Sequence, residues 1–350
     1  MARVLLLSVV LGITLSGCAS GAGYLLKQGS YLLRYSTGTR SVDAMIADPA
    51  TPSPTRSFLM MVRDVKTYAV QKVGLRDNAN YTRYKVIPSD HLVDVVSACA
   101  TDSFTPYLWS YPVLGKLPYK GFYERADADA EAARLRKDGW DVIERPVDAF
   151  STLGFVRDPV YSFMEKYSPF EIASLIIHEQ THATLFLKGQ PSFNEELATF
   201  VGDEGAFEWL SARYGRDSPE YRNAVDLQAD QETFVSLLQK LSQSLADVYA
   251  QPLSRQEKLD RKAAAIKDFN DRLVAQRGTL FRTESYRGVG ALPLNNAYLS
   301  LYSLYEDDLP LLRAYWEKIC GSSLPRFMEQ AKVLSRHGDV KEQMRDALAR

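Results

Sequence analysis

Cysteine and histidine are both scarce in this sequence. It contains three cysteines and four histidines in 350 residues. Cys18 ends the N-terminal apolar stretch, and only Cys99 and Cys320 lie beyond it, too few for a cysteine-based zinc site. These two either form one disulfide or stay as buried free thiols, and both alternatives are open.

The sequence also lacks an excess of one charge and a long apolar run. Its 42 Lys and Arg residues are balanced by 43 Asp and Glu residues, so nothing indicates nucleic acid or another polyanion as a partner. The apolar run from Val4 to Leu15 is too short to span a membrane as a helix. Internal repeats and low-complexity tracts are absent as well, which leaves an ordinary folded chain.

The first residues indicate export. They read MARVLLLSVVLGITLSGC, with an early arginine, an apolar run and small residues before Cys18. The end of this stretch resembles a bacterial lipobox, in which the cysteine becomes the lipidated first residue. We expect residues 1–17 to be a signal peptide and Cys18 to anchor the chain to the bacterial envelope, with Ala19 favouring the outer membrane facing the periplasm. The alternative is an ordinary cleaved signal with an incidental cysteine.

The order of predicted elements indicates an α+β fold that is predominantly helical. Residues 18–153 form a small mixed α/β region, in which residues 80–121 predict short strands and turns. A helix over 126–139, ended by Gly139, is followed by a strand over 140–147. Residues 154–350 are the helical region, and we expect them to form one continuous unit with 18–153.

A long helical hairpin is predicted over residues 221–274. Pro252 breaks the first helix, and Ser254 with Glu257 forms a capping box for the second. In the simplest interpretation this hairpin covers the core.

Residues 176–186 read IIHEQTHATLF and contain the candidate metal-binding residues. Ser168, Pro169 and Glu171 predict the start of a helix, and Gly189 predicts its end. His178 and His182 therefore lie one turn apart on one face, where both can bind one Zn²⁺. Glu179 lies beside them in an H-E-x-x-H arrangement, which arises by chance in only roughly a few chains per thousand of this composition. The alternative is a pair of core histidines beside a buried carboxylate.

A third ligand is expected at the start of the next helix, which begins in the stretch PSFNEELATFVGDEG after a short connector. Glu195 and Glu196 both qualify by proximity. They point about 100° apart on a helix, so only one of them is expected to bind the metal. Spacing alone does not choose between them.

The pattern His178-Glu179-x-x-His182 followed by Asn194-Glu195 resembles the gluzincin metallopeptidases. The resemblance implies a helical, zincin-like catalytic half and makes Glu195 the third ligand, because thermolysin-like and M1-aminopeptidase-like enzymes carry it directly after Asn. Two candidates for supporting a ligand histidine are Thr199, where thermolysin-like enzymes have an Asp, and Asp203, two turns from Glu195. Asp203 could equally be a solvated helix-face charge. The spacing between the histidines and the glutamate is shorter here than in either group.

A second resemblance covers nearly the whole mature chain. The stretches YPVLGKLPYKGFYERADADAEAARLRKDGWDV, HEQTHATLF, FNEELATFVGDEG and ALPLNNAYLSLYSLY occur in the order of the bacterial lipoproteins described as "putative aminopeptidase". The resemblance implies a zinc-dependent peptidase with one zinc per chain. Gln180 and Thr181 replace the apolar pair more common in that family, but neither is a ligand position.

The implied reaction is hydrolysis of a peptide by water on an open position of the zinc, with Glu179 as general base and then general acid. Tyr305 matches a recurrent tyrosine of the family and is the candidate donor to the oxyanion, with Tyr298 and Tyr302 as rivals. Asn295 and Asn296 either orient the substrate or cap the following helix.

The direction of cleavage stays open. The Gly-x-Met-Glu-Asn loop with which M1-like enzymes bind a free amine is absent, and Asp158 and Glu165 are weak substitutes. An endopeptidase or another amide hydrolase would use the same centre. The competing class is a non-catalytic zinc-binding envelope lipoprotein, but a structural zinc site normally has four protein ligands and no need of Glu179.

Overall fold

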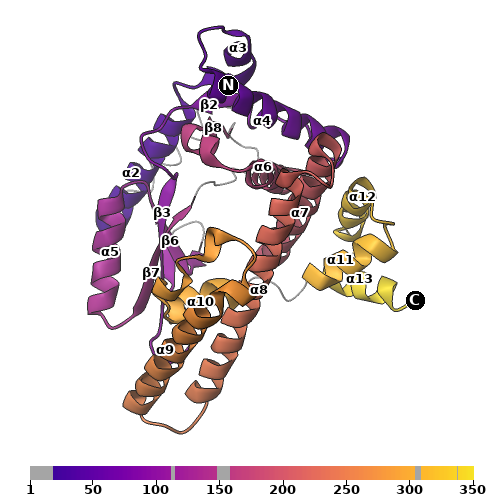
Figure 1. The fold of residues 1–350 in the computed structure, drawn as a ribbon. Helices are drawn as coiled ribbons and strands as arrows, with labels where there is room; N and C mark the ends of the chain where they lie inside the picture. The colour runs from indigo at the N-terminus through magenta and orange to yellow at the C-terminus, as the bar shows by residue number, and fades with distance from the viewer. Residues whose placement is uncertain (1–18, 112–114, 148–157, 304–308, 337) are drawn as a thin grey trace.

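A computed structural model describes residues 19–111, 115–147, 158–303, 309–336 and 338–350. These residues are mostly helical, with short strands in small sheets, so the predicted α+β, predominantly helical class is confirmed. Figure 1 shows a mixed α/β part on one side, the helices α6 and α7 across from it, and a long hairpin of α8 and α9 extending away from both.

The mixed part contains small sheets and the helices that cover them. Its helices are α2 (Ala19–Ser36), α3 (Val42–Ala47), α4 (Ser53–Gln71) and α5 (Arg125–Lys137). One sheet has the order β1-β2-β8, from β1 (Arg40–Ser41), β2 (Arg83–Lys85) and β8 (Val160–Tyr161). A second has the order β6-β3-β7, from β3 (Val93–Cys99), β6 (Tyr119–Phe122) and β7 (Asp141–Val147). A two-stranded ribbon joins β4 (Trp109–Tyr111) to β5 (Gly115–Leu117).

The two faces of the β6-β3-β7 sheet have different neighbours. Helix α5 covers one face, where Val96, Phe122 and Val142 pack against its alanines and Leu135. Strand β3 is antiparallel to both neighbours, and Ser97 pairs with Tyr119 on one side and with Ile143 on the other. Because side chains alternate along a strand, these three residues share the face opposite α5. That face is directed toward the centre of the molecule (Figure 1).

The remainder of the chain is helical. After the short helix η1 (Ser162–Lys166) come α6 (Pro169–Thr184), α7 (Pro191–Tyr214), α8 (Pro219–Tyr249) and α9 (Arg255–Leu280). They are followed by η2 (Glu284–Tyr286), η3 (Val289–Ala291), α10 (Asn296–Ser303), α11 (Leu309–Lys318), α12 (Leu324–Leu334) and α13 (Val340–Leu348). The predicted hairpin is confirmed as α8 and α9, and the capping box of Ser254 and Glu257 begins α9.

Two of the hydrophobic clusters position the helical half. The larger one joins α3, α4 and β2 to α6, α7 and the C-terminal helices. The second holds the hairpin against α10 and against Cys99 and Ile143 of the sheet. A buried polar network fastens the same junction, since the Lys262 ammonium binds Asp141, whose carboxylate also accepts from the Asn296 backbone N–H at 2.8 Å.

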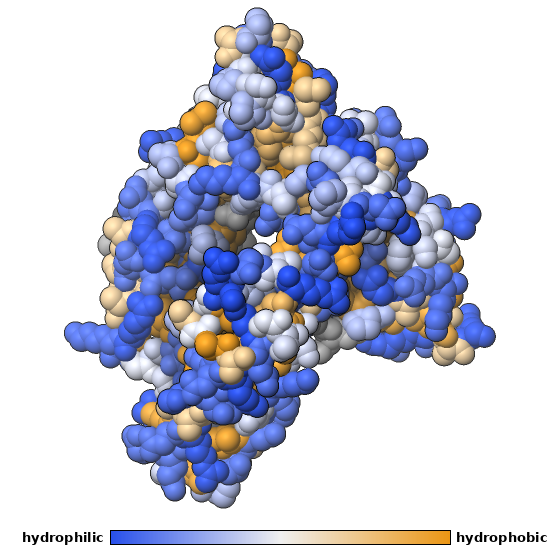
Figure 2. Space-filling view, viewed as in Figure 1, coloured by the Kyte–Doolittle hydropathy of each residue, from blue (hydrophilic) through white to orange (hydrophobic). Residues whose placement is uncertain are grey.

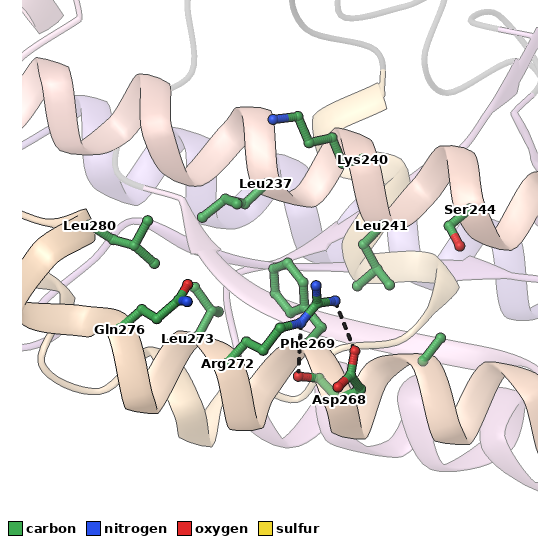
Figure 3. A pocket seen from close by; sticks show the side chains of 11 residues that line it. Leu237, Lys240, Leu241, Ser244, Asp268, Phe269, Arg272, Leu273, Gln276 and Leu280 are labelled. Atoms are coloured by element: carbon green, nitrogen blue, oxygen red, sulfur yellow. Dashed lines mark hydrogen bonds and ion pairs between the residues drawn. The ribbon is translucent and has the colours of Figure 1, made fainter.

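A groove of about 250 Å³ runs along the hairpin between α8 and α9 (Figure 3). Its apolar floor includes Leu237, Leu241 and Phe269, and Arg272 and Asp268 form an ion pair at 2.9 Å at its edge. No residue of the H-E-x-x-H segment lines it.

Cys99 and Cys320 are both buried free thiols. They lie in different hydrophobic clusters, so the disulfide alternative is wrong and the free-thiol alternative is confirmed. Within the part of the chain that the structure describes, no helix has the length and apolarity needed to cross a membrane.

Candidate metal centre

Helix α6 begins as predicted and ends earlier than predicted. The Ser168 hydroxyl accepts from the Glu171 N–H, and the Glu171 carboxylate accepts from the Ser168 N–H, which completes the capping box. The helix stops at Thr184, not near Gly189, because Leu185 is extended. Both histidines still lie within the helix, one turn apart, with their rings 4.7 Å apart and nearly perpendicular.

Asn194 explains the early end. Its buried side chain accepts from the Leu187 N–H and donates to the Leu187 C=O, each at 2.8 Å. These bonds hold the connector as a loop, so α7 begins at Pro191 and Glu195 lies in its second turn. Glu195 is the fifth residue of α7, so it lies near the start of that helix, as expected, just beyond the first turn. An asparagine before the third carboxylate thus has a local structural role, because it orients the connector between the two site helices.

Two glycines let α6 and α7 approach closely. A Cβ on Gly202 would meet the Ser174 carbonyl oxygen at 3.0 Å and the His178 Cβ at 3.1 Å. A Cβ on Gly205 would meet the Ile177 side chain at 3.0 Å. The missing side chains bring the backbone of α7 against the histidine-bearing helix.

His178, His182 and Glu195 converge in space. The two Nε2 atoms are 3.1 Å apart, and they lie 3.6 Å and 3.4 Å from the two carboxylate oxygens of Glu195. Their donor atoms all lie within 4.8 Å of one another. Residues from the two helices α6 and α7 therefore present three Lewis-base atoms to one point.

Glu196 does not take part, although it is equally near in sequence. Its buried carboxylate forms an ion pair at 2.7 Å with Lys341 of α13. Glu195 therefore faces the histidines and Glu196 faces the C-terminal helices. The angle of about 100° between successive helix residues required the two side chains to point apart, but it did not determine which of them faces the histidines.

The electrostatics follow from this convergence. Burial raises the pKa of the Glu195 carboxyl, but hydrogen bonds from His178 and His182 outweigh it and lower the pKa to about 2. Burial lowers the pKa of His178, and the neighbouring Glu195 outweighs that effect and leaves the pKa raised. The two imidazoles thus keep the Glu195 carboxylate ionised over the physiological pH range.

The donor set fits a zinc ion. Zinc bonds of about 2.0–2.2 Å in tetrahedral geometry separate neighbouring ligand atoms by about 3.3–3.6 Å. The imidazole nitrogens here are 3.1 Å apart, and they lie 3.6 and 3.4 Å from the two Glu195 oxygens, which is close to that range. Two imidazoles and one carboxylate are also a donor set typical of catalytic zinc. The Nδ1 atom of His182 is buried and has no hydrogen-bond partner among the described residues.

Glu179 is buried next to His178, with 8% of its surface accessible. Tyr81, which the sequence did not suggest, lies close enough that the charge of Glu179 adds to the effect of burial in raising the phenol pKa. Tyr81 is fully enclosed and adopts φ +58°, a left-handed conformation uncommon for an aromatic residue. Such backbone strain persists where the surrounding structure holds it, often at functional sites.

Of the two predicted supporting residues, Asp203 is the better placed. Its carboxylate accepts a hydrogen bond from Ser174 at 2.6 Å, one turn before His178 on α6. Burial raises the pKa of Asp203, while the Ser174 bond and the positive charge of His178 oppose the rise. Thr199 is half-buried, and no hydrogen bond from it to either histidine occurs among the described residues. The interpretation of Asp203 as a solvated charge was therefore wrong.

Tyr305 and Cys18 lie outside the described residues. The rivals Tyr298 and Tyr302 pack against each other, with ring centroids 5.5 Å apart, and Tyr302 also contacts Phe234 of the hairpin. They belong to the hairpin cluster, whereas the residues around the metal centre belong to the larger one.

Asn295 and Asn296 fasten α10 to the sheet. The Asn295 side chain accepts from the Tyr298 N–H as a helix cap and donates to the Val142 carbonyl. Asn296 is fully buried and donates to two carbonyls while accepting from Tyr249. The capping alternative is confirmed for Asn295. Contact of either side chain with substrate stays a prediction, and these hydrogen bonds argue against it because they already engage both side chains.

Comparison with known proteins supplies the family. A family model described as "Putative aminopeptidase" matches residues 23–347. The chain therefore belongs to that family. No individual curated protein and no solved structure matches the chain.

Proposed function

We propose that this protein is a zinc-dependent aminopeptidase. The observation that carries the proposal is the convergence of His178, His182 and Glu195, with Glu179 buried directly beside them. The family match over residues 23–347 supports peptide hydrolysis as the reaction class. The close helix pair α6 and α7 supports a pre-organised centre, because both elements are rigid and in direct contact.

His178, His182 and Glu195 would hold one Zn²⁺ per chain, and the ion, when bound, supplies a Lewis acid that polarises a carbonyl and makes a water molecule more acidic. Glu179 then accepts a proton from the attacking water and transfers it to the leaving amine. Its burial keeps this proton away from bulk solvent. Tyr305, from the family resemblance, is the proposed hydrogen-bond donor to the developing oxyanion.

The experiment measures bound metal and turnover together. Full-length protein, purified in detergent, is assayed for zinc content and for hydrolysis of matched free and N-acetylated peptides. We expect about one zinc per chain and hydrolysis that prefers the free amine. Glu179→Gln should keep the metal and lose turnover by about a hundredfold or more. Glu196→Gln is the matched control, because it alters a neighbouring buried carboxylate that pairs with Lys341.

The outcomes separate the alternatives. A parent that binds zinc and hydrolyses no peptide favours a non-catalytic zinc-binding lipoprotein. Equal hydrolysis of acetylated peptides favours an endopeptidase. A parent without zinc contradicts the proposed centre.

We further propose that Cys18 is lipidated and that the protein is anchored to the outer membrane facing the periplasm. The support is the lipobox-like sequence before Cys18 and Ala19 after it. Cys18→Ser should abolish incorporation of labelled fatty acid and release the protein from the membrane fraction. Retention of label in that variant would contradict the proposal.

A further inference from the structure

One arginine of the β6-β3-β7 sheet has a different environment from its neighbours. On the face covered by α5, Arg125 binds Asp94 at 3.0 Å and Arg136 binds Glu144 at 2.7 Å. Arg145 of β7 pairs with Val95 of β3 and lies on the opposite face. It is half-buried, its Nε is buried without a hydrogen-bond partner, and it forms no ion pair within the described residues.

The face that carries Arg145 is directed toward the centre of the molecule (Figure 1). Tyr119 lies on the same face, two strands away, and it is 41% exposed. Burial raises the phenol pKa of Tyr119, the charge of Glu195 raises it further, and the charge of Arg145 lowers it. Strand register places Tyr119 and Arg145 on one face, and Tyr119 lies within electrostatic range of both Glu195 and Arg145.

The molecular surface is hollowed in this region. Figure 2 shows a hollow at the centre of the molecule, bordered largely by hydrophilic residues. In the ribbon view the same place lies between strands β3 and β6 on one side and helices α6 and α7 on the other (Figure 1).

A half-buried guanidinium without a carboxylate partner is costly, because burial removes water from a charge that nothing neutralises. Arginine also presents a planar fork that matches a carboxylate in two parallel hydrogen bonds. Two described anions near this face are engaged, since Glu195 faces the histidines and Asp141 binds Lys262. Because no carboxylate of the described residues pairs with Arg145, a ligand is well suited to supply its counter-charge.

We propose that Arg145 and Tyr119 form the substrate-binding wall opposite the metal centre, and that Arg145 binds a carboxylate of a short peptide. This inference rests on the proposed function and adds its substrate class. The carboxylate is either the C-terminus of the peptide or an acidic side chain. Arg145 would hold the peptide across the hollow, and Tyr119 would line the path between that carboxylate and the scissile bond.

The test uses full-length, zinc-loaded protein and two matched pairs of peptides. The first pair is trialanine and its C-terminal amide, and the second is Ala-Glu-Ala amide and Ala-Gln-Ala amide. Turnover is measured in the parent, and binding is measured by calorimetry in the Glu179→Gln background. Each measurement is repeated with Arg145→Gln, with Arg145→Lys and with Arg136→Gln, an arginine paired on the opposite face of the same sheet.

We expect the parent to prefer the carboxylate member of one pair by about tenfold to a hundredfold, the range for a hydrogen-bonded charge. Arg145→Gln should abolish that preference through KM more than kcat, while zinc content stays at that of the parent. Arg145→Lys should keep part of the preference for the carboxylate peptide. This variant retains the positive charge, so it still tests the inference if Arg145→Gln does not fold. Arg136→Gln should leave it intact. The pair that shows the preference identifies the source of the carboxylate.

Two results would overturn the inference in distinguishable ways. If the parent cleaves the peptides but shows no preference within either pair, or if Arg145→Gln retains the preference, the inference is wrong and the proposed function stands. If the zinc-loaded parent neither binds nor cleaves any of the four peptides, both are wrong.

Discussion

A Cβ on Gly202 would lie 3.1 Å from the Cβ of His178 and 3.0 Å from the Ser174 carbonyl oxygen. Both contacts are with parts of α6 that cannot rotate away. The absence of a side chain at Gly202 therefore sets the separation of the two helices that carry the metal ligands.

Gly202→Ala should push α7 away from α6. Overpacking of this kind costs about 1–3 kcal/mol of the free energy of unfolding. We also expect zinc affinity to fall by about tenfold to a hundredfold, as when a support of a metal ligand is lost. Chelator competition and thermal unfolding of the metal-free protein measure the two effects separately.

Gly278→Ala is the matched control for that substitution. A Cβ on Gly278, within α9, meets nothing within 4 Å. It should stabilise the protein by about 0.5–1 kcal/mol and leave zinc affinity unchanged. Unchanged zinc affinity in Gly202→Ala would show that the helix separation does not control the metal centre.

Glu195 and Glu196 form a second matched pair. Glu195→Gln should weaken zinc binding by more than about a hundredfold, because it removes one of three charged or basic ligands. Glu196→Gln should keep zinc but lose about 3 kcal/mol of unfolding free energy, since Lys341 is left partly buried without its partner. Zinc titration and denaturant unfolding of both variants measure zinc affinity and stability separately. Equal zinc affinities in the two variants would contradict the assignment of zinc binding to Glu195.

Local sequence signals accounted for the elements but not for the contacts between them. The capping boxes at Ser168 and Ser254 predicted the starts of α6 and α9 because the cap and its glutamate are three residues apart. The end of α6 depends on Asn194, whose bonds to Leu187 cross the connector, so the local stop signal Gly189 placed it too late.

The same limit applies to the site. The histidine spacing along one helix brought His178 and His182 together, as the sequence predicted. The choice between Glu195 and Glu196 depends on Lys341, which is far along the chain and carries no motif. Tyr81 and Arg145 reach the site through a strained loop and through strand register, and neither leaves a recognisable pattern in the sequence.

Tyr81 should matter for turnover more than for stability. Tyr81→Phe keeps the ring in the core and removes only the hydroxyl near Glu179. We expect the unfolding free energy to change by less than about 1.5 kcal/mol, as for loss of one hydrogen-bonding group, and kcat to fall by about tenfold because the polar environment of the general base changes.

Steady-state kinetics with zinc content measured in parallel checks this expectation. Tyr84→Phe, which removes a hydroxyl bound to Glu165 away from the histidines, is the control. Equal kcat in Tyr81→Phe and the parent would mean that the phenol only packs.

His91 gives stability a pH dependence that is separate from the metal centre. Its Nδ1 lies 2.8 Å from Asp90 and its Nε2 lies 3.1 Å from the buried Asp94. Burial lowers the pKa of His91, but the two carboxylates outweigh it and leave the pKa above 6.5. The charged imidazole therefore stabilises the fold fully below about pH 6.5, and this contribution is lost as the pH rises through the folded-state pKa.

His91→Gln should remove that contribution. Because the imidazole is partly exposed, the ion pairs are worth at most about 1 kcal/mol, or about 1–2 °C in Tm for a chain of this size. We expect the variant to unfold at a lower temperature than the parent at pH 5.5 and at nearly the same temperature at pH 8.5. Scans of the metal-free proteins at both pH values, compared as differences between variant and parent, cancel the titration of the other histidines. A larger difference at pH 8.5 would reverse the sign and show that the neutral imidazole, through its hydrogen bonds, is the stabilising form.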